Sequence, residues 1–293
     1  MLKPRVGRHY RRRGKALVPC PNPSIADILA LSPSEEILTV LSKPTWGHTV
    51  LLHDLSYVSK AGSGIGPAEV ESMRLVSRHT SVPISHVIHT TFNAYYGRIE
   101  MSIVPGVSLD TRWDMLDERS KESVCRQTWN LIAKVQAIPR PPELDGFVRC
   151  GVDGSAPRDY IFKDLQDPPR ALRSDAELRA RVHERYVHFG GYQYEYELSE
   201  MLPRSDRTVF THADIAPRNI MIDEENKITG ILDWEHAGWY PEYWEYAQIL
   251  RSASWGDWSE WMDRTAPRKW DLHGIEAARR VLLLALDEPA YYW

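Results

Sequence analysis

Long hydrophobic runs and paired cysteines are both missing from this chain of 293 residues. The longest apolar run covers residues 281–286, whereas a membrane-spanning helix needs roughly 20 residues. No apolar segment follows the basic first residues, so we expect no signal peptide and no membrane partner. The three cysteines, Cys20, Cys125 and Cys150, are far apart and form no CxxC pair. This pattern argues against a disulfide framework or a zinc site and favours a reducing, cytoplasmic location.

Positive charge is scarce outside the start of the chain. Of the 36 basic residues, seven lie in residues 1–22, which contain no acidic residue, so 29 basic residues face 40 acidic ones in the rest. An acidic body argues against nucleic acid as a partner. We predict that residues 1–22 form a flexible, solvated basic tail, although Arg11-Arg12-Arg13 leaves an anionic surface or a targeting role open.

Short strands and one helix predict a small α+β lobe over residues 23–105. Residues 49–52 and 55–60 alternate as two strands around a tight turn at His53-Asp54, with Val58 and Lys60 on one face. A helix is expected at residues 67–79, because apolar residues recur at helical spacing and Pro67 suits a first turn. Further strands are expected at residues 83–88 and 98–104, and short segments at 25–31 and 35–41.

Residues 106–293 predict a larger, mostly helical lobe. Helices are expected at residues 118–138, 175–188, 243–252 and 274–286, and short strands at 208–210, 220–222 and 228–232. The fold class is therefore α+β with two lobes. The sequence does not indicate an oligomeric state.

The most informative stretch is FTHADIAPRNIMID (residues 210–223), followed by GILDWE (residues 230–235). Together they give H-x-D-x-x-x-x-N, a polar hairpin and an Asp after an apolar strand. This is the spacing that phosphoryl transfer from ATP needs, because Asp214 can accept the proton of a substrate hydroxyl. Asn219 and Asp233 supply the hard oxygen donors that Mg²⁺ prefers.

These motifs, with ILDWEHAGWYPEYWE at residues 231–245, closely resemble the aminoglycoside-phosphotransferase-like family, especially its fungal members. The resemblance extends over about residues 35–250. It implies a bilobal protein-kinase-like fold, ATP and Mg²⁺ as cofactors, and a small-molecule hydroxyl acceptor. It also implies that Asp214 is the catalytic base and that Asn219 and Asp233 are the magnesium ligands. His212 corresponds to the structural histidine of the catalytic loop rather than to a proton carrier, and Glu245 to the acidic residue that braces this loop.

In the first lobe the resemblance implies a strand lysine paired with a helix glutamate to hold the α- and β-phosphates. Lys60 is the lysine, and Glu69 fits the glutamate better than Glu71, although one turn of register would exchange them. Backbone groups near Ser102 and Val104 are expected to contact adenine. Gly106 is expected to serve the turn after this segment rather than the ligand.

Three features depart from the family pattern. The loop at residues 42–48 has one glycine and no G-x-G-x-x-G, which puts its grip on ATP in doubt. Ala213 replaces the usual glycine of the catalytic loop, and an alanine tolerates that backbone only if φ is negative. Ser102 replaces a frequent acidic residue of the hinge, which is harmless if only backbone groups bind the base.

The same residues bear on three alternative functions. A protein kinase is disfavoured because only eleven residues separate Asp233 from Glu245, too few for a segment that docks a peptide. A nucleotide-binding pseudoenzyme would explain the unusual 42–48 loop but not the intact ionic residues. A metal hydrolase built on three histidines is rejected because no carboxylate accompanies them; these are His79, His86 and His89. Acidic residues of the second lobe suit either a cationic acceptor or a solvated face; they are Asp153, Asp159, Glu195, Glu197 and Glu242.

Overall fold

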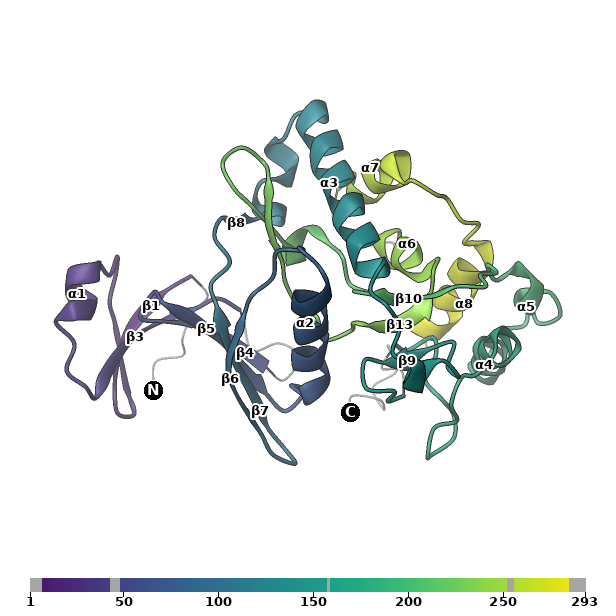
Figure 1. Ribbon diagram of the computed structural model, residues 1–293, viewed down its shortest axis with the longest axis horizontal. Helices are drawn as coiled ribbons and strands as arrows, with labels where there is room; N and C mark the ends of the chain where they lie inside the picture. The colour runs from purple at the N-terminus through teal and green to yellow at the C-terminus, as the bar shows by residue number, and fades with distance from the viewer. Residues whose placement is uncertain (1–6, 43–47, 157–158, 252–255, 285–293) are drawn as a thin grey trace.

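The structure, a computed structural model, describes residues 7–42, 48–156, 159–251 and 256–284. These residues form two lobes, one built on a seven-stranded antiparallel sheet and one mostly helical (Figure 1), which confirms the predicted α+β fold. The first lobe contains α1 (Ile25–Leu29) and the strands β1 (His9–Arg13), β2 (Ala16–Pro19), β3 (Glu35–Val40), β4 (His48–His53), β5 (Tyr57–Gly62), β6 (Val87–Phe92) and β7 (Gly97–Ser102). The strands lie in the order β2-β1-β3-β4-β5-β7-β6.

The hairpin β1–β2 occupies the segment for which the sequence predicted a flexible basic tail, residues 1–22. Strand β1 pairs antiparallel with β2 on one side and with β3 on the other. Across the second pairing Arg11 forms an ion pair with Glu35 at 2.7 Å, and Arg12 forms one with Glu36. The prediction of a tail was wrong for this hairpin, because acidic residues of β3 lie opposite the basic run.

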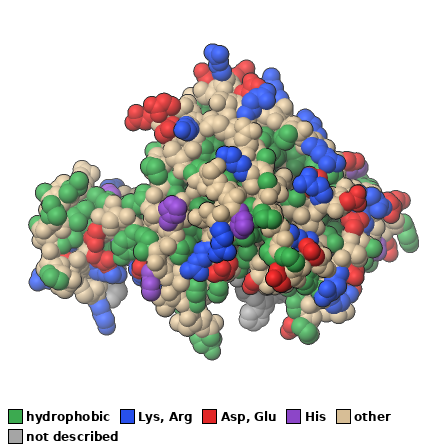
Figure 2. All heavy atoms as spheres, viewed as in Figure 1, with side chains coloured by type: hydrophobic (Ala, Val, Ile, Leu, Met, Phe, Trp, Pro, Cys, Tyr) green, Lys and Arg blue, Asp and Glu red, His purple; other side chains and the backbone are tan. Residues whose placement is uncertain are grey.

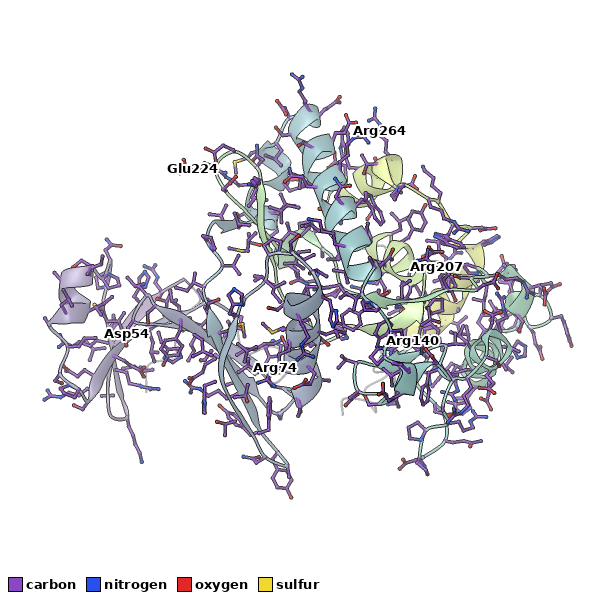
Figure 3. All side chains as sticks on the ribbon, viewed as in Figure 1. Asp54, Arg74, Arg140, Arg207, Glu224 and Arg264 are labelled. Carbon is purple, nitrogen blue, oxygen red and sulfur yellow. The ribbon has the colours of Figure 1, made fainter. Side chains whose placement is uncertain are left out.

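Strands β4 and β5 form the predicted hairpin, with a tight turn in which Asp54 has a positive φ of 47°. Asp54 marks this turn in Figure 3. Side chains alternate along β5 as the sequence predicted: Val58 and Lys60 line the space between the lobes, whereas the Ser59 hydroxyl contacts the buried His53 ring at 2.7 Å. The alternation therefore points Lys60 toward the second lobe.

Helix α2 (Pro67–His79) has the bounds that the sequence predicted, with Pro67 in its first turn. Met73 and Val76 of this helix belong to the same hydrophobic core as side chains of the second lobe. The helix therefore contacts both lobes, and its buried face holds Glu69 beside β5.

The second lobe follows the predicted helical plan. Its helices are α3 (Glu118–Gln136), α4 (Asp175–His188), α5 (Leu198–Met201), α6 (Trp244–Ile249), α7 (Trp258–Thr265) and α8 (His273–Leu284). Its strands are β8 (Val107–Ser108), β9 (Cys150–Gly151), β10 (Thr208–Thr211), β11 (Ile220–Ile222), β12 (Ile228–Ile231) and β13 (Gly238–Pro241). Of these, α5, α7, β8, β9 and β13 were not predicted, because each is short or lacks a clear periodicity.

Two small sheets position the loops of this lobe. One has the order β12-β11-β8 and the other β10-β13-β9. Glu224 marks the tip of the β11–β12 hairpin in Figure 3. Gly106, just before β8, has a φ of +102°, and a Cβ atom there would lie 2.3 Å from the carbonyl oxygen of Ile222. A side chain is therefore excluded, and the glycine serves the turn as expected.

The core of the second lobe is rich in aromatic side chains, and four tryptophans are among its most deeply buried residues: Trp234, Trp239, Trp244 and Trp258. On the outside, side chains of both charges are interspersed over the face shown in Figure 2. None of the described helices is long and apolar enough to cross a membrane.

Candidate active site

A cavity of about 470 Å³ lies between the two lobes. Its walls are largely apolar, with Val50 and Met101 from the first lobe and Met221 and Ile231 from the second. The lining also includes six of the eight residues that the sequence proposed for the site, namely Lys60, Glu69, Ser102, Val104, Asn219 and Asp233. Ser42 and His48 line it too, but residues 43–47 of the glycine-poor loop lie outside the described residues.

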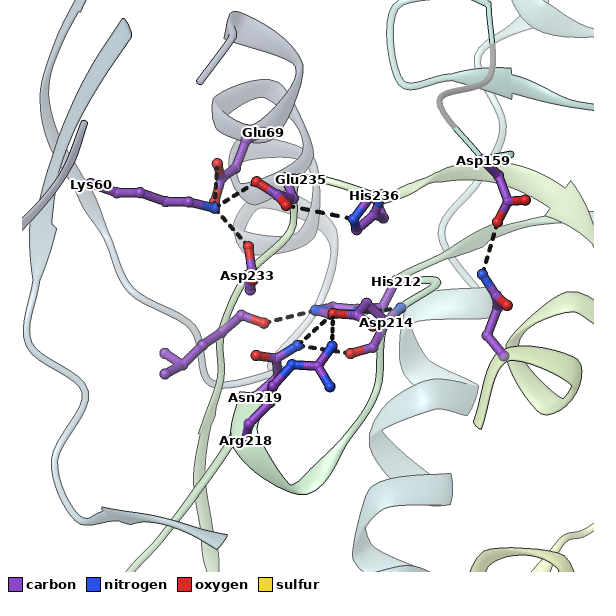
Figure 4. Close-up of polar contacts among 12 residues, drawn as sticks. Lys60, Glu69, Asp159, His212, Asp214, Arg218, Asn219, Asp233, Glu235 and His236 are labelled. Carbon is purple, nitrogen blue, oxygen red and sulfur yellow. Dashed lines mark hydrogen bonds and ion pairs between the residues drawn. The ribbon is translucent and has the colours of Figure 1, made fainter. Parts of the chain in front are cut away.

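Lys60 is the centre of a buried ionic cluster (Figure 4). Its Nζ atom lies 3.0 and 3.1 Å from the carboxylate oxygens of Glu69, 2.6 Å from Asp233 and 3.0 Å from Glu235. Burial acts to lower the pKa of the Lys60 ammonium, but the three carboxylates outweigh burial and raise this pKa. The lysine is therefore charged, and it joins the first lobe to the second.

The two glutamates considered as partners of Lys60 lie in different surroundings. Glu69 is 4% exposed and faces Lys60 from α2. Glu71 lies two residues further, on another face of the helix, where it pairs with Arg74 at 2.8 Å. Of these two glutamates, Glu69 is the one that pairs with Lys60 in the structure.

Asp233 is the second residue after β12, and its backbone adopts a left-handed conformation with a φ of +67°. Asp is one of the few residues besides glycine that adopt this conformation readily. Burial acts to raise the pKa of Asp233, but the Lys60 ammonium outweighs it and holds this pKa below its ordinary value. The carboxylate is thus ionised at the edge of the cavity.

The catalytic loop predicted from the sequence runs from the end of β10 to β11. Within it, His212 is buried, and both ring nitrogens are engaged: Nε2 lies 2.9 Å from the carbonyl oxygen of Leu232, and Nδ1 accepts from the backbone N–H of Asp214 at 3.2 Å. Burial lowers the pKa of His212, so the ring is neutral. It has no ring nitrogen left for proton transfer, which agrees with a structural role and not with a catalytic one.

Glu245 holds the same loop from α6. Its carboxylate accepts hydrogen bonds from the backbone N–H groups of His212 at 2.7 Å and of Ala213 at 3.1 Å. Burial raises the pKa of Glu245 to about 7, although the two N–H donors act in the opposite direction. The brace predicted for Glu245 is therefore present as a pair of hydrogen bonds.

Ala213 has a φ of +66°, which is the left-handed region that disfavours alanine. A residue with a Cβ atom in this region costs about 1–2 kcal/mol relative to glycine. The loop keeps this geometry because Glu245 binds the N–H of Ala213 and the surrounding core encloses it. Ala213 is therefore a strained residue of this loop.

Asp214 is held by two arginines and one amide. Arg251 lies 3.0 Å from Oδ1, while Arg218 forms an ion pair with Oδ2. The Nδ2 group of Asn219 donates to the same Oδ2 atom and to the backbone carbonyl of Asp214, each at 2.9 Å. Because a carboxylate has about four acceptor positions, Asp214 can still accept a further hydrogen bond.

The two expected magnesium ligands lie in neighbouring parts of the site. Asn219 uses its amide nitrogen on Asp214, so its amide oxygen is on the other branch of the side chain. Figure 4 shows Asn219 in the contact group of Asp214 and Asp233 in the contact group of Lys60, and both residues line the cavity. Among the described residues, no three His, Cys, Asp or Glu side chains are grouped so that they could hold a metal ion by themselves.

The segment expected to contact adenine borders the cavity at Ser102 and Val104. The backbone N–H of Ser102 donates to the carbonyl oxygen of His86 at 2.9 Å, and its hydroxyl accepts from the N–H of His86. The N–H of Ser102 is therefore committed to the sheet. This leaves its carbonyl group and the backbone of Val104 as the groups to consider for a base.

Three residues of the site were not predicted from the sequence. Arg218 directly precedes Asn219, and Glu235 lies two residues after Asp233. These positions within the motifs were the only sequence signal for a place in the site. Arg251 lies beyond them, just after α6, and nothing in its sequence surroundings indicated that it reaches Asp214.

Comparison with known proteins places this site in a family. The model of the phosphotransferase enzyme family matches residues 66–280. A search of curated proteins finds no match. Among solved structures, the chain is similar to an aminoglycoside-3'-phosphotransferase of type VIII, with 18% identity, a TM-score of 0.54, and coverage of 84% of this chain and 92% of that one.

A second similar structure is the gentamicin complex of APH(2")-IIa, with 14% identity, a TM-score of 0.53, and coverage of 85% and 81%. A third is APH(3'')-Id from Streptomyces rimosus, with 17% identity, a TM-score of 0.46, and coverage of 85% and 91%. At these identities the first two structures, with TM-scores above 0.5, support the fold alone. The family model covers most of the chain. The chain belongs to the phosphotransferase enzyme family.

Proposed function

We propose that this protein is an ATP-dependent kinase that transfers the γ-phosphate to a hydroxyl group of a small molecule. The observation that carries the proposal is the ion pair between Lys60 and Asp233, which sets a cation and a carboxylate at the edge of an apolar cavity. Asp214 lies in the neighbouring loop, where the Nδ2 group of Asn219 donates a hydrogen bond to its carboxylate. Phosphoryl transfer needs this combination of a phosphate-binding cation, hard oxygen donors and a base.

On binding, Lys60 would hold the α- and β-phosphates, with Glu69 keeping the ammonium in place. The residues present fit a magnesium site, because Mg²⁺ uses one or two carboxylates and completes its shell with phosphate oxygens and waters. Asp233 and the amide oxygen of Asn219 would hold it, and Glu235 is a third oxygen donor in the same group. When bound, the metal neutralises charge on the transferring phosphoryl group.

Asp214 would act as the base. Its carboxylate accepts the proton of the acceptor hydroxyl as the hydroxyl oxygen attacks the γ-phosphorus, and the bond to the β,γ-bridging oxygen breaks to release ADP. The Nδ1 atom of His212 accepts from the backbone N–H of Asp214 and so fixes Asp214, and His212 takes no part in the proton transfer. The adenine ring would lie between the apolar walls, against the carbonyl group of Ser102 and the N–H group of Val104.

A small acceptor fits the chain better than a peptide or a nucleic acid. The eleven residues between Asp233 and Glu245 include β13, which pairs with β10 and β9 and is buried. This leaves no segment there to dock a peptide. The retained ionic residues also argue against a pseudoenzyme.

A thermal-shift titration with ATP, with and without Mg²⁺, tests the proposal. A ligand that binds only the folded state adds about 2.7 kcal/mol of stability at a hundredfold excess over its dissociation constant. We expect a Mg²⁺-dependent rise in the wild type that is lost in Asp233→Asn. The control variant Asp110→Asn changes an exposed Asp of the same charge and should respond as the wild type does. No rise in the wild type at millimolar ATP would contradict a kinase function.

A further inference from the structure

A second cavity, of about 400 Å³, lies on the first lobe between α2 and the start of β6. Its volume is in the range of sites that bind small molecules. The lining residues come from α2 and from the segment that leads into β6; they are Met73, Arg74, Ser77, Arg78, Ser85, His86 and Val87. Arg74 marks this part of α2 in Figure 3. Met73 and Ser85 also line the cavity between the lobes, so the two cavities are neighbours.

The polar lining of the second cavity is basic, and it includes no acidic side chain. Arg74 pairs with Glu71 at 2.8 Å, and both of these side chains are about half exposed. Arg78 lies four residues further along α2, on the same face, and is exposed. Within the part of the chain that the structure describes, Arg78 forms no ion pair. The cavity therefore has a positive charge without a counterion.

Acidic residues on the neighbouring elements are already paired with other cations. Three carboxylates pair with Lys60 in the first cavity; they are Glu69, Asp233 and Glu235. Glu100 on β7 pairs with Arg98 at 2.9 Å. It lies opposite Ser59 in the sheet, on the face turned away from Lys60. An anion bound in the second cavity would therefore be the counterion of Arg78.

Ser85 gives a second, independent indication of a ligand. The residue is 5% exposed, and its hydroxyl makes no hydrogen bond with any residue that the structure describes. Buried hydroxyl groups normally have a hydrogen-bond partner, because the group loses its contacts with water. Since Ser85 lines the second cavity, an oxygen atom of a ligand there can accept a hydrogen bond from it.

The walls of the second cavity are joined to both ends of the first. Helix α2 also carries Glu69, which pairs with Lys60 at the end proposed for the phosphates. On the opposite wall, the backbone of His86 forms two hydrogen bonds with Ser102, each of 2.9 Å. Ser102 borders the end proposed for adenine. A ligand that contacts both walls therefore contacts the two segments that flank a bound nucleotide.

We propose that the second cavity binds a small organic anion and thereby regulates nucleotide binding; the regulatory part rests on the proposed function. The carboxylate or phosphate of the anion binds the Arg78 guanidinium, with the Ser85 hydroxyl as a further donor. An apolar part of the ligand packs against Met73 and Val87. Because both cavities include Met73 and Ser85, binding in one changes the affinity in the other, and this change is reciprocal.

The test uses four aromatic probes of similar size: benzoate, phenyl phosphate, the neutral benzamide and the cationic benzylamine. Binding is measured by thermal shift of the full-length protein, with and without a non-hydrolysable ATP analogue and Mg²⁺. The ionic strength is held constant, because salt screens exposed charges. We expect benzoate, phenyl phosphate or both to stabilise the protein also when the ATP analogue is saturating, and benzamide and benzylamine to have little effect. The two anions distinguish a carboxylate from a phosphate.

In Arg78→Gln the affinity for the anionic probe should fall about tenfold, because a hydrogen bond between charged groups is lost. Ser85→Ala should weaken it as well. The control variant Arg119→Gln, which changes an exposed arginine of α3, should bind the probe as the wild type does. Without a probe, the shift caused by the ATP analogue should be the same in Arg78→Gln, Arg119→Gln and the wild type.

The regulatory part is tested by titrating the ATP analogue with and without a saturating anionic probe. The dissociation constant of the analogue should change about fivefold or more in the wild type and remain unchanged in Arg78→Gln. No change in the wild type would overturn the regulatory role. Equal binding of benzoate and benzamide, or an anion effect that persists in Arg78→Gln, would overturn the site itself.

Binding of the anion in the first cavity gives a different result. The apparent affinity for the probe would then fall in proportion to the concentration of the ATP analogue, which would also overturn the proposal. Failure of the kinase assignment is separate, because the ATP analogue alone would then give no Mg²⁺-dependent shift in the wild type. The probe shift and its loss in Arg78→Gln would still report on the second cavity.

Discussion

The Nζ atom of Lys60 lies 2.6 Å from the Oδ1 atom of Asp233, although 173 positions separate the two residues in the sequence. Substitution of Lys60 by Met should destabilise the protein by about 2–4 kcal/mol, because Glu69, Asp233 and Glu235 then remain close together without a cation. Urea denaturation measures this change. The loss should be smaller at pH 5 than at pH 8, since protonation relieves the repulsion among the carboxylates.

The matched control for this substitution is Lys134→Met, which removes an exposed lysine that donates a hydrogen bond to the hydroxyl of Ser81. Its effect should lie within about 0.5 kcal/mol at both pH values. Equal effects of the two substitutions would show that Lys60 does not balance the cluster.

Substitution of Asp214 by Asn should lower turnover by about 10²–10⁴-fold, the usual contribution of a general base. The dissociation constant of ATP should change little, because Lys60 and Asp233 hold the phosphates in the proposed complex. Single-turnover kinetics together with an ATP titration separates the two quantities. Turnover at the wild-type rate would remove Asp214 from the proposed mechanism.

Substitution of Ala213 by Gly should stabilise the protein by up to about 1 kcal/mol, because the residue has a φ of +66° and glycine adopts this conformation without strain. Thermal unfolding should show a rise of a few degrees at most, about 2–4 °C for each kcal/mol in a chain of this size. The control is Ala216→Gly, three residues further, where φ is −150° and glycine has no such advantage. That variant should be less stable than the wild type.

Glu245 gives the protein a specific pH dependence. Its pKa of about 7 in the folded state lies above the ordinary value of 4.5, so the folded protein retains a proton that the unfolded chain releases. The associated stability is complete below pH 4.5 and is lost as the pH rises through 7, by up to about 3 kcal/mol. In Glu245→Gln this dependence disappears.

Urea denaturation of the wild type and of Glu245→Gln between pH 5 and pH 8 checks this expectation. The stability of the wild type relative to Glu245→Gln should fall as the pH rises, because only the wild type loses stability at this position. Glu122→Gln, on the exposed face of α3, should run parallel to the wild type. A constant difference between wild type and Glu245→Gln would show that Glu245 does not titrate in this range.

Much of this fold is readable from the sequence where a regular pattern and a local signal agree. Pro67 and the apolar spacing after it gave the bounds of α2, and alternation along β5 gave the direction of Lys60. The hairpin β1–β2 was missed because its stability comes from pairing with β3, a contact between segments that local patterns do not record. The basic residues Arg11 and Arg12 suggested a tail because their acidic partners, Glu35 and Glu36, lie on another segment of the chain.

The site divides in a similar way. Asp214 and Asn219 stand at fixed spacing in one continuous segment, and their residue types indicated the contact between them. Asp233 follows in the same segment and lines the cavity together with Asn219. Arg251 reaches Asp214 from the end of another helix, and only the three-dimensional path of the chain brings it there. The choice between Glu69 and Glu71 as the partner of Lys60 likewise depends on which face of α2 is turned toward β5. The structure defines this rotation of the helix about its axis, and the sequence does not.

The support of the catalytic loop by Glu245 comes from inside the protein, since α6 is buried along its whole length. Arg251, which contacts the same loop from the solvent side, follows immediately after that helix. An exchange of the outer residue therefore leaves the inner brace intact. In evolutionary terms, the residue at position 251 can vary without loss of the inner support that Glu245 gives to this loop.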